Sequence, residues 1–293
     1  MTCRIVTVAT LVSCLAAGLI VSGKSCFAQP SNQPTGDAVC RLATPQGVSY
    51  GTWGDAPAKP APTLMVFASS IETTLGSGSD GYYRQCGSFL APQGYLCVSL
   101  DLPCHGGQRQ QGETEGLAGW RERIDAGAPL IEPFTRRAKA VLDHLIKQGQ
   151  ADPQRIAACG VSRGGFAALH LAARDKRIAA VAAFAPVTDL AALQEFAGVE
   201  ALSAVQELRL SALAPRLASR PIWLVIGDQD RRVGTDQSIT FARHVFRAAR
   251  ELQLEGALQL HVLPEPGGHT TPRGSFETAA QWIDQQLHPQ ATP

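Results

Sequence analysis

The stretch that decides the fold is Gly160-Val161-Ser162-Arg163-Gly164-Gly165. It follows an apolar run at 156–161 that is typical of a buried strand, and it precedes a segment at 164–173 with the apolar spacing of a helix. Glycines two positions before and two positions after the serine allow a sharp turn in which the strand and the helix approach closely. Such a turn would project the Ser162 hydroxyl above the edge of a sheet.

Strand and helix patterns alternate on both sides of this turn. Short apolar runs predict strands at 63–68, 95–102, 156–161, 178–185, 222–226 and 258–263. Helical spacing of apolar residues predicts helices at 81–91, 133–148, 164–173, 190–213, 241–252 and 276–287. Residues 41–53 have the pattern of a hairpin, and 106–127 is a long loop with one turn of helix near Trp120. This alternation predicts a single α/β domain with a mostly parallel central sheet and helices on both faces.

The composition limits the classes of function. The chain is 45% hydrophobic and 17% charged, which is ordinary for a globular protein. Its 26 basic and 25 acidic side chains give a formal net charge of +1, and it has no long basic run. Nucleic-acid-binding proteins concentrate positive charge, so nucleic acid is excluded as the expected partner.

The first 28 residues have the pattern of a signal peptide. Arg4 precedes an apolar stretch at 5–21, and Cys26-Phe27-Ala28 fits the preference for small residues before a cleavage site. We therefore expect a signal peptide at 1–28, a flexible lead-in at 29–40 and one folded domain at 41–293. The protein would then be exported to the periplasm or the extracellular space, without a stable membrane span after processing.

Two other interpretations of the N-terminus remain open. The apolar stretch is close to the shortest length that crosses a bilayer, so it could serve as an uncleaved anchor. Leu11-Val12-Ser13-Cys14 also resembles a lipoprotein box. Cleavage before Cys14 would, however, leave an exposed apolar tail at 15–21.

Removal of the signal peptide would leave five cysteines. They are Cys40, Cys86, Cys97, Cys104 and Cys159. Because an odd number leaves at least one thiol unpaired within the chain, and because pairing cannot be read from spacing, the disulfides stay undetermined. Cys97 and Cys159 lie in predicted buried strands, so we expect Cys40, Cys86 and Cys104 to be more exposed and better disulfide candidates. No cysteine spacing resembles a zinc site.

A serine hydroxyl needs a base and an acid that orients the base. The strand at 222–226 leads into Gly227-Asp228-Gln229-Asp230, which places carboxylates just beyond a strand end. We assign the acid to Asp230, with Asp228 as the alternative. His269 follows the last predicted strand in a glycine-rich loop and is the expected base, since the order serine, acid, histidine is then satisfied.

These motifs resemble the α/β-hydrolase superfamily, and within it the dienelactone-hydrolase-like and prolyl-oligopeptidase-like branch. The resemblance extends from the strand at 63–68 to the last helix. It also includes 101–107, Asp-Leu-Pro-Cys-His-Gly-Gly, which is similar to a D-x-x-G-H-G loop with Cys104 in place of the usual glycine. In that family the histidine of this loop is structural, so the resemblance implies no catalytic role for His105.

The resemblance also implies an oxyanion hole made of two backbone N–H groups. One would come from Arg163, which follows the serine, and the other from the loop after the strand at 63–68. Many relatives carry His-Gly in that loop, whereas this chain has Ala68-Ser69-Ser70-Ile71. We assign the second donor to Ser70, with Ser69 and Ile71 as alternatives.

The sequence thus predicts a serine hydrolase that forms an acyl-enzyme on Ser162, with no metal and no organic cofactor. We expect the substrate to be a small carboxylic ester. A peptidase or amidase acting on short peptides is the alternative, but relatives of that kind usually carry a propeller domain for which 293 residues leave no room. A non-catalytic binding protein on the same scaffold is the second alternative, because a fold does not fix a function.

Overall fold

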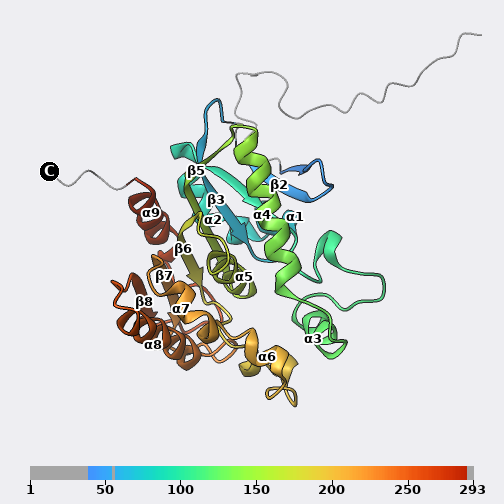
Figure 1. The fold of residues 1–293 in the computed structure, drawn as a ribbon, viewed down its shortest axis with the longest axis vertical. Helices are drawn as coiled ribbons and strands as arrows, with labels where there is room; N and C mark the ends of the chain where they lie inside the picture. Colours follow the sequence, from blue (N-terminus) through green and yellow to red (C-terminus); the bar gives the residue numbers. More distant parts are fainter. Residues whose placement is uncertain (1–38, 55–56, 289–293) are drawn as a thin grey trace, which may run out of the picture. The chain divides into compact units, whose positions relative to one another are not determined.

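The centre of the protein is an eight-stranded sheet with the order β1-β2-β4-β3-β5-β6-β7-β8 (Figure 1). The computed structural model describes residues 39–54 and 57–288. The strands are β1 (Cys40–Ala43), β2 (Ser49–Trp53), β3 (Ala61–Phe67), β4 (Leu96–Ser99), β5 (Ala151–Val161), β6 (Ile178–Phe184), β7 (Ile222–Gly227) and β8 (Leu258–Leu263). β1 and β2 form an antiparallel hairpin, and β2 pairs antiparallel with β4; the other neighbouring strands are parallel.

Helices and helical turns connect the parallel strands. The α-helices are α1 (Ile71–Leu75), α2 (Gln85–Leu90), α3 (Leu117–Asp125), α4 (Ile131–Lys147), α5 (Arg163–Ala172), α6 (Ser203–Glu207), α7 (Ala214–Leu217), α8 (Thr235–Glu251) and α9 (Ser275–Leu287). The 3-10 turns are η1 (Gly78–Arg84), η2 (Ala91–Gln93), η3 (Gly106–Gln108), η4 (Leu190–Ala192), η5 (Gln194–Phe196) and η6 (Leu210–Leu213).

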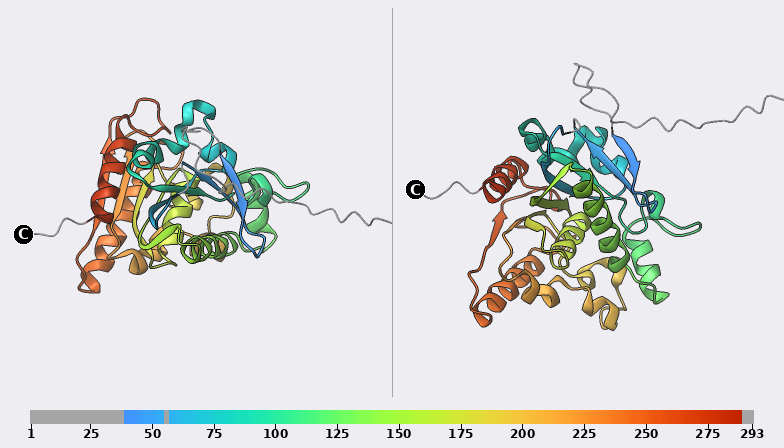
Figure 2. Two further views of the ribbon diagram at one scale, coloured as in Figure 1. Left: turned by 90° about the horizontal axis from the view of Figure 1, so that it is seen from above. Right: turned by 45° about the horizontal axis from the view of Figure 1, so that its top comes forward.

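Two hydrophobic cores lie on the two faces of the sheet. On one face α4, α5 and α8 bury residues such as Phe134, Phe166 and Phe241. On the other face α1, α2 and α9 pack through residues such as Leu75 and Ile283. The left view of Figure 2 shows α2 (teal) and α4 (green) on opposite sides of the strands. The predicted α/β class with helices on both faces is therefore confirmed.

The strand order has a topological switch point at the C-terminal end of the sheet. From β3 the chain passes to β4 on one side of β3 and then returns to β5 on the other side. The connections that follow β3 and β5 thus lead away in opposite directions. In open α/β sheets such a switch point is where ligands bind, beyond the C-terminal ends of the strands.

Several predicted elements differ from the observed ones in extent. The predicted helix at 81–91 is a 3-10 turn followed by the short α2, and the predicted irregular helix at 190–213 is a series of short turns with α6. The predicted helix at 241–252 begins earlier, as α8, at Thr235. Its first turn holds Thr235, Asp236 and Gln237, which carry no apolar signal, so the periodicity became visible only near Phe241.

The expected exposure of two cysteines was wrong. Cys86 and Cys104 are buried, as are Cys97 and Cys159, and all four are free thiols. Cys86 faces the sheet from α2 and shares a core with Cys97 and Cys159. Burial raises the pKa of the Cys104 thiol to about 12, so this thiol is protonated at neutral pH.

The predicted signal peptide and most of the lead-in lie outside the described residues. Within 39–54 and 57–288, none of the helices combines the length and the apolar character needed to cross a bilayer.

Candidate active site

β5 leads directly into α5 through a tight turn at Ser162. Ser162 has a φ of 55° and a ψ of −118°, and residues other than glycine seldom adopt a positive φ. Its N–H donates to the carbonyl of Phe184 at 2.9 Å. A side chain at Gly160 would collide with the backbone of Gly164, and one at Gly164 would collide with the carbonyl of Phe67. The close approach of β3, β5 and α5 therefore requires these glycines.

Three side chains from separate loops form a hydrogen-bonded chain at this turn. His269 Nε2 lies 3.0 Å from Ser162 Oγ, and His269 Nδ1 lies 2.8 Å from Asp230 Oδ2. An ionised carboxylate can only accept, so the Nδ1 proton donates to Asp230, and Nε2 is then free to accept from the serine hydroxyl. The Asp230 side chain is 0% exposed, whereas that of His269 is 28% exposed toward solvent.

The two aspartates after β7 have different contacts. Besides His269, Asp230 accepts from the N–H groups of Arg232 at 2.9 Å and Val233 at 3.1 Å, which fixes its carboxylate. Asp228 accepts from the N–H of Glu265 at 2.9 Å. Asp228 therefore holds the start of the loop that carries the histidine, and only Asp230 contacts the imidazole.

The loop after β3 contains the three candidates for the second oxyanion donor. The N–H of Ser69 donates to Thr74 Oγ1 at 3.2 Å, and the N–H of Ile71 donates to Asp101 Oδ1 at 2.7 Å. Within the described part of the chain, the N–H of Ser70 has no protein acceptor. Of the three, Ser70 is thus the residue whose donor is available to a ligand.

Strand register brings this loop level with the serine. Phe67 pairs with Gly160 in the parallel ladder of β3 and β5, so Ser70 and Ser162 follow the ends of neighbouring strands. Arg163 is the first residue of α5, where a backbone N–H has no partner inside the helix. The positive end of the helix dipole lies at the same point and favours negative charge.

The segment 101–107 supports the loop after β3 (residues 68–71), which we call the donor loop. The carboxylate of Asp101 accepts from the N–H groups of Ile71 and Gly107, the latter at 2.9 Å. Cys104 has a φ of 59°, which explains why glycine is usual at this position of the similar loops. His105 Nδ1 donates to the carbonyl of Pro103 at 2.8 Å, and burial lowers the pKa of its imidazole, so it lies within the loop as a neutral side chain.

The side chain of Arg163 places a charge next to Ser162 in the chain, and no role for this charge was predicted from the sequence. Its guanidinium is partly buried, and this burial lowers its pKa. In the described part of the chain its Nε is buried without a hydrogen-bond partner. Arg232 donates to Glu195 at 2.5 Å. Both side chains lie close enough to Arg163 to affect its pKa: Arg232 lowers it and Glu195 raises it. The arginine was visible in the motif, but its environment comes from loops distant in sequence.

The loop that carries His269 is held by a tyrosine from η1, a segment distant in the sequence. The Tyr82 hydroxyl donates to Thr271 Oγ1 at 2.8 Å and accepts from the Thr271 N–H at 2.9 Å. Tyr82 comes from η1, which follows the donor loop in the chain. One tyrosine thus links η1 to the loop that carries the histidine.

A cavity of about 530 Å³ borders the donor loop. Its walls are Ser70, Glu72 and polar residues between Gly106 and Glu115. A larger cavity of about 1230 Å³ is lined by none of the three hydrogen-bonded side chains. Among the residues that the structure describes, no group of histidine, cysteine or acidic side chains is placed to hold a metal ion.

Comparison with protein families gives one match. The prolyl oligopeptidase family of serine peptidases matches residues 137–288, about half of the chain. This region contains Ser162, Asp230 and His269, whereas Ser70 lies before it. None of the curated protein sequences compared with the chain matches it.

Solved structures with the same fold include esterases and peptidases. An acetyl xylan esterase from Thermoanaerobacterium sp. has a TM-score of 0.60 and 17% identity, over 88% of this chain and 86% of that one. A cold-adapted esterase from an Arctic intertidal metagenomic library has a TM-score of 0.59 and 19% identity, over 85% of this chain and 93% of that one. Porphyromonas gingivalis dipeptidyl peptidase 4 has a TM-score of 0.58 and 16% identity, over 85% of this chain.

The chain spans only 35% of the length of that peptidase and 36% of a Bacteroides ovatus dipeptidyl aminopeptidase. At identities this low the structural similarity shows the α/β-hydrolase fold, and the family match adds the class of chemistry. The chain belongs to the prolyl oligopeptidase family of serine hydrolases.

Proposed function

We propose that this serine hydrolase cleaves small carboxylic esters through an acyl-enzyme on Ser162. The observation that carries the proposal is the hydrogen-bonded chain from Ser162 Oγ through His269 to Asp230. His269 accepts the serine proton as the hydroxyl attacks the ester carbonyl, and Asp230 stabilises the imidazolium that forms. His269 then donates this proton to the departing alkoxide, and a water molecule repeats the sequence to release the acid.

The proposed oxyanion hole uses the N–H groups of Arg163 and Ser70. The first is unpaired because it opens α5, and the second lacks a protein acceptor in the described part of the chain. Preorganised donors of this kind stabilise the charge that develops on the carbonyl oxygen, typically by about 3 kcal/mol each. Neither donor depends on its side chain.

We propose an ester substrate and not a peptide because of how much of each structural neighbour this chain covers. The two esterases described above match this chain along 86% and 93% of their own length, whereas the dipeptidyl peptidase matches along 35%. Most of such a peptidase therefore has no counterpart in the described domain. This supports a substrate that the domain can bind by itself.

The test is hydrolysis of a short-chain p-nitrophenyl ester by the protein and by its Ser162→Ala variant, beside aminoacyl p-nitroanilides. We expect ester turnover that is lost with the serine, and labelling of Ser162 by a fluorophosphonate. Turnover of anilides without esters would establish the peptidase instead. A folded protein that neither cleaves these substrates nor reacts with the fluorophosphonate would indicate a binding scaffold.

We also propose that the protein is exported and that residues 1–28 are removed. The support is the sequence pattern of Arg4, the apolar stretch and Ala28. Cell fractionation followed by N-terminal sequencing tests this, and Gln29 is the expected first residue. Retention in the membrane fraction that is abolished by Cys14→Ala would establish the lipoprotein, and retention of the full N-terminus would establish the anchor.

A further inference from the structure

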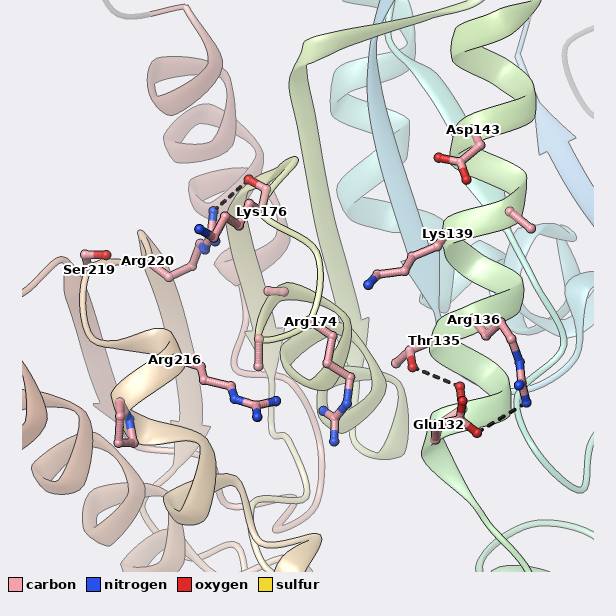
Figure 3. Close-up of a pocket in the computed structure, with 14 residues that line it drawn as sticks. Glu132, Thr135, Arg136, Lys139, Asp143, Arg174, Lys176, Arg216, Ser219 and Arg220 are labelled. Carbon is pink, nitrogen blue, oxygen red and sulfur yellow. Dashed lines mark hydrogen bonds and ion pairs between the residues drawn. The ribbon is translucent and has the colours of Figure 1, made fainter.

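The larger cavity, which we call the basic groove, is built by three separate segments. Its walls come from α4, from the C-terminal end of α5 with the loop after it, and from α7 with the loop after it (Figure 3). It measures about 1230 Å³. Its basic side chains are Arg136, Lys139, Arg174, Lys176, Arg216 and Arg220.

The basic groove lies at the end of α5 opposite the proposed catalytic serine. Ser162 immediately precedes α5, and the groove is lined by Ala172, Ala173 and Arg174 at its other end. Ten helical residues at 1.5 Å each separate the two ends by about 15 Å. The groove is therefore distinct from the hydrolase site.

Among the described residues, most of the basic side chains in the groove have no ion-pair partner. Its two acidic side chains already have arginine partners: Glu132 pairs with Arg136 at 3.2 Å, and Asp143 pairs with Arg177 at 2.5 Å. In the described part of the chain, the other five basic side chains form no ion pair with a carboxylate. The whole chain has a net charge of only +1, so this excess is a local concentration.

Two of the arginines repel each other across the groove. In Figure 3 the guanidinium groups of Arg174 and Arg216 point toward a common space, and Lys139 approaches from α4. The pKa of Arg174 is lowered by burial and then by the positive charge of Arg216. The negative end of the α5 dipole explains a cation at Arg174, but it does not explain Arg216 or Lys139, which lie elsewhere.

Arg174 is also held in position. Its Nη1 lies 2.8 Å from His170 Nδ1 and donates to the carbonyl of His170 at 3.1 Å. Arg220 is fixed in the same way by the carbonyls of Lys176 and Ile178. A fixed cation such as Arg174 is preorganised for an anion, because little side-chain entropy is lost on binding.

The lining indicates which anion fits. Its apolar residues are small, namely Ala140, Ala172, Ala173 and Pro215, so no apolar anchor is offered. Arginines bind phosphate and carboxylate through two parallel hydrogen bonds, whereas lysines bind phosphate as point charges. Cations from three walls, Arg174, Arg216 and Lys139 among them, favour an anion with several charged groups close together. We propose that the basic groove binds a ligand with neighbouring phosphate groups.

The test is calorimetric titration of the full chain with tripolyphosphate at physiological ionic strength. We expect saturable binding, and we expect the double variant Arg174→Gln/Arg216→Gln to weaken it by about tenfold or more. The matched control is Arg243→Gln/Arg247→Gln on α8, which removes the same charge from an exposed surface elsewhere. Circular dichroism verifies that each variant is folded, and no readout depends on ester hydrolysis.

Each outcome decides the proposal. An equal loss in the two double variants would show attraction to net charge only, and absence of binding by the unmodified protein would show that there is no site. Citrate that binds as tightly as tripolyphosphate would overturn the preference for phosphate. Cosedimentation with vesicles of phosphatidylcholine and cardiolipin, lost only in Arg174→Gln/Arg216→Gln, would support the proposal and assign the phosphates to a lipid headgroup.

Discussion

The two ends of α5 present positive charge in opposite ways. At the N-terminal end the backbone supplies it, through the unpaired N–H of Arg163 and the positive end of the helix dipole beside Ser162. At the C-terminal end the dipole is negative, so side chains such as Arg174 must supply the charge of the basic groove. One helix can thus serve two sites that attract anions, but by different physical means.

This difference determines what a substitution can do at each end. The N-terminal end is specified by steric fit, since Gly160 and Gly164 have no room for a side chain. The C-terminal end is specified by side-chain charge and by the His170 contact that holds Arg174. Changes near Ser162 should therefore affect chemistry or backbone packing, and changes near Arg174 should affect binding and the response to pH.

The largest expected effect is that of Ser162→Ala on the N-terminal end. Removing the nucleophile should lower kcat by about 10⁶-fold, since the residual rate comes only from binding and the oxyanion donors. The backbone at φ 55° is retained, so the melting temperature should stay close to that of the unmodified protein. Ester hydrolysis and thermal unfolding measure the two quantities. Substantial turnover by the variant would show that Ser162 is not the nucleophile.

The next effect distinguishes the two aspartates. Asp230→Asn should lower kcat by about 10⁴-fold, because the amide favours the imidazole tautomer that cannot accept the serine proton. Asp228→Asn keeps an oxygen that accepts from the Glu265 N–H, so it should change kcat by less than about threefold. Steady-state kinetics with the same ester compare them. Equal losses in the two variants would contradict the assignment of the acid to Asp230.

A third substitution tests the steric specification of the N-terminal end. The added methyl group of Gly164→Ala would meet the Phe67 carbonyl, which β3 holds in the sheet. We expect the free energy of unfolding to fall by about 3 kcal/mol. At Gly256 the nearest atom would be Phe246 Cδ1 at 3.4 Å, so Gly256→Ala should change stability by less than about 0.5 kcal/mol. Urea denaturation of both variants measures this, and an unchanged Gly164→Ala would remove the steric argument.

The sequence was most informative where the signal is local. The glycine spacing around Ser162 is a steric requirement of neighbouring residues, so it could be recognised without the rest of the chain. Asp230 and His269 were placed by simple rules, because side chains just beyond parallel strand ends meet at one edge of the sheet. The structure brings these three side chains into hydrogen-bond contact. Their catalytic roles remain predictions until the variants are measured.

The rest depends on contacts between distant segments. The N–H of Ile71 is occupied by the carboxylate of Asp101, 30 residues away in the sequence. Without that contact, Ser70 could not be told apart from Ile71 as the available donor. The burial of Cys86 depends on the face that α2 turns toward the sheet, which a short irregular segment does not reveal. The basic groove likewise needs α4, α5 and α7 together, and no stretch of the sequence is strongly basic by itself.

The smallest expected effect concerns the C-terminal end of α5 and its response to pH. His170 is fully buried, with its Nε2–H donating to the carbonyl of Leu208 at 3.0 Å and its Nδ1 accepting from Arg174. Burial lowers the pKa of His170 to about 3, and the positive charge of Arg174 acts in the same direction. The unfolded chain takes up this proton below about pH 6.5, whereas the folded protein does not.

The contribution of neutral His170 to the free energy of unfolding should therefore be fully present above about pH 6.5. It should be lost progressively as the pH drops toward 3. Between pH 7 and pH 5, His170 should account for a loss of about 2 kcal/mol in the free energy of unfolding. His170→Gln should reduce this loss, while His244→Gln on α8 should not. Urea denaturation at both pH values measures the difference for each protein. Identical pH dependence in all three would mean that folding does not lower the pKa of His170, and the C-terminal end of α5 would then be no more sensitive to pH than the N-terminal end.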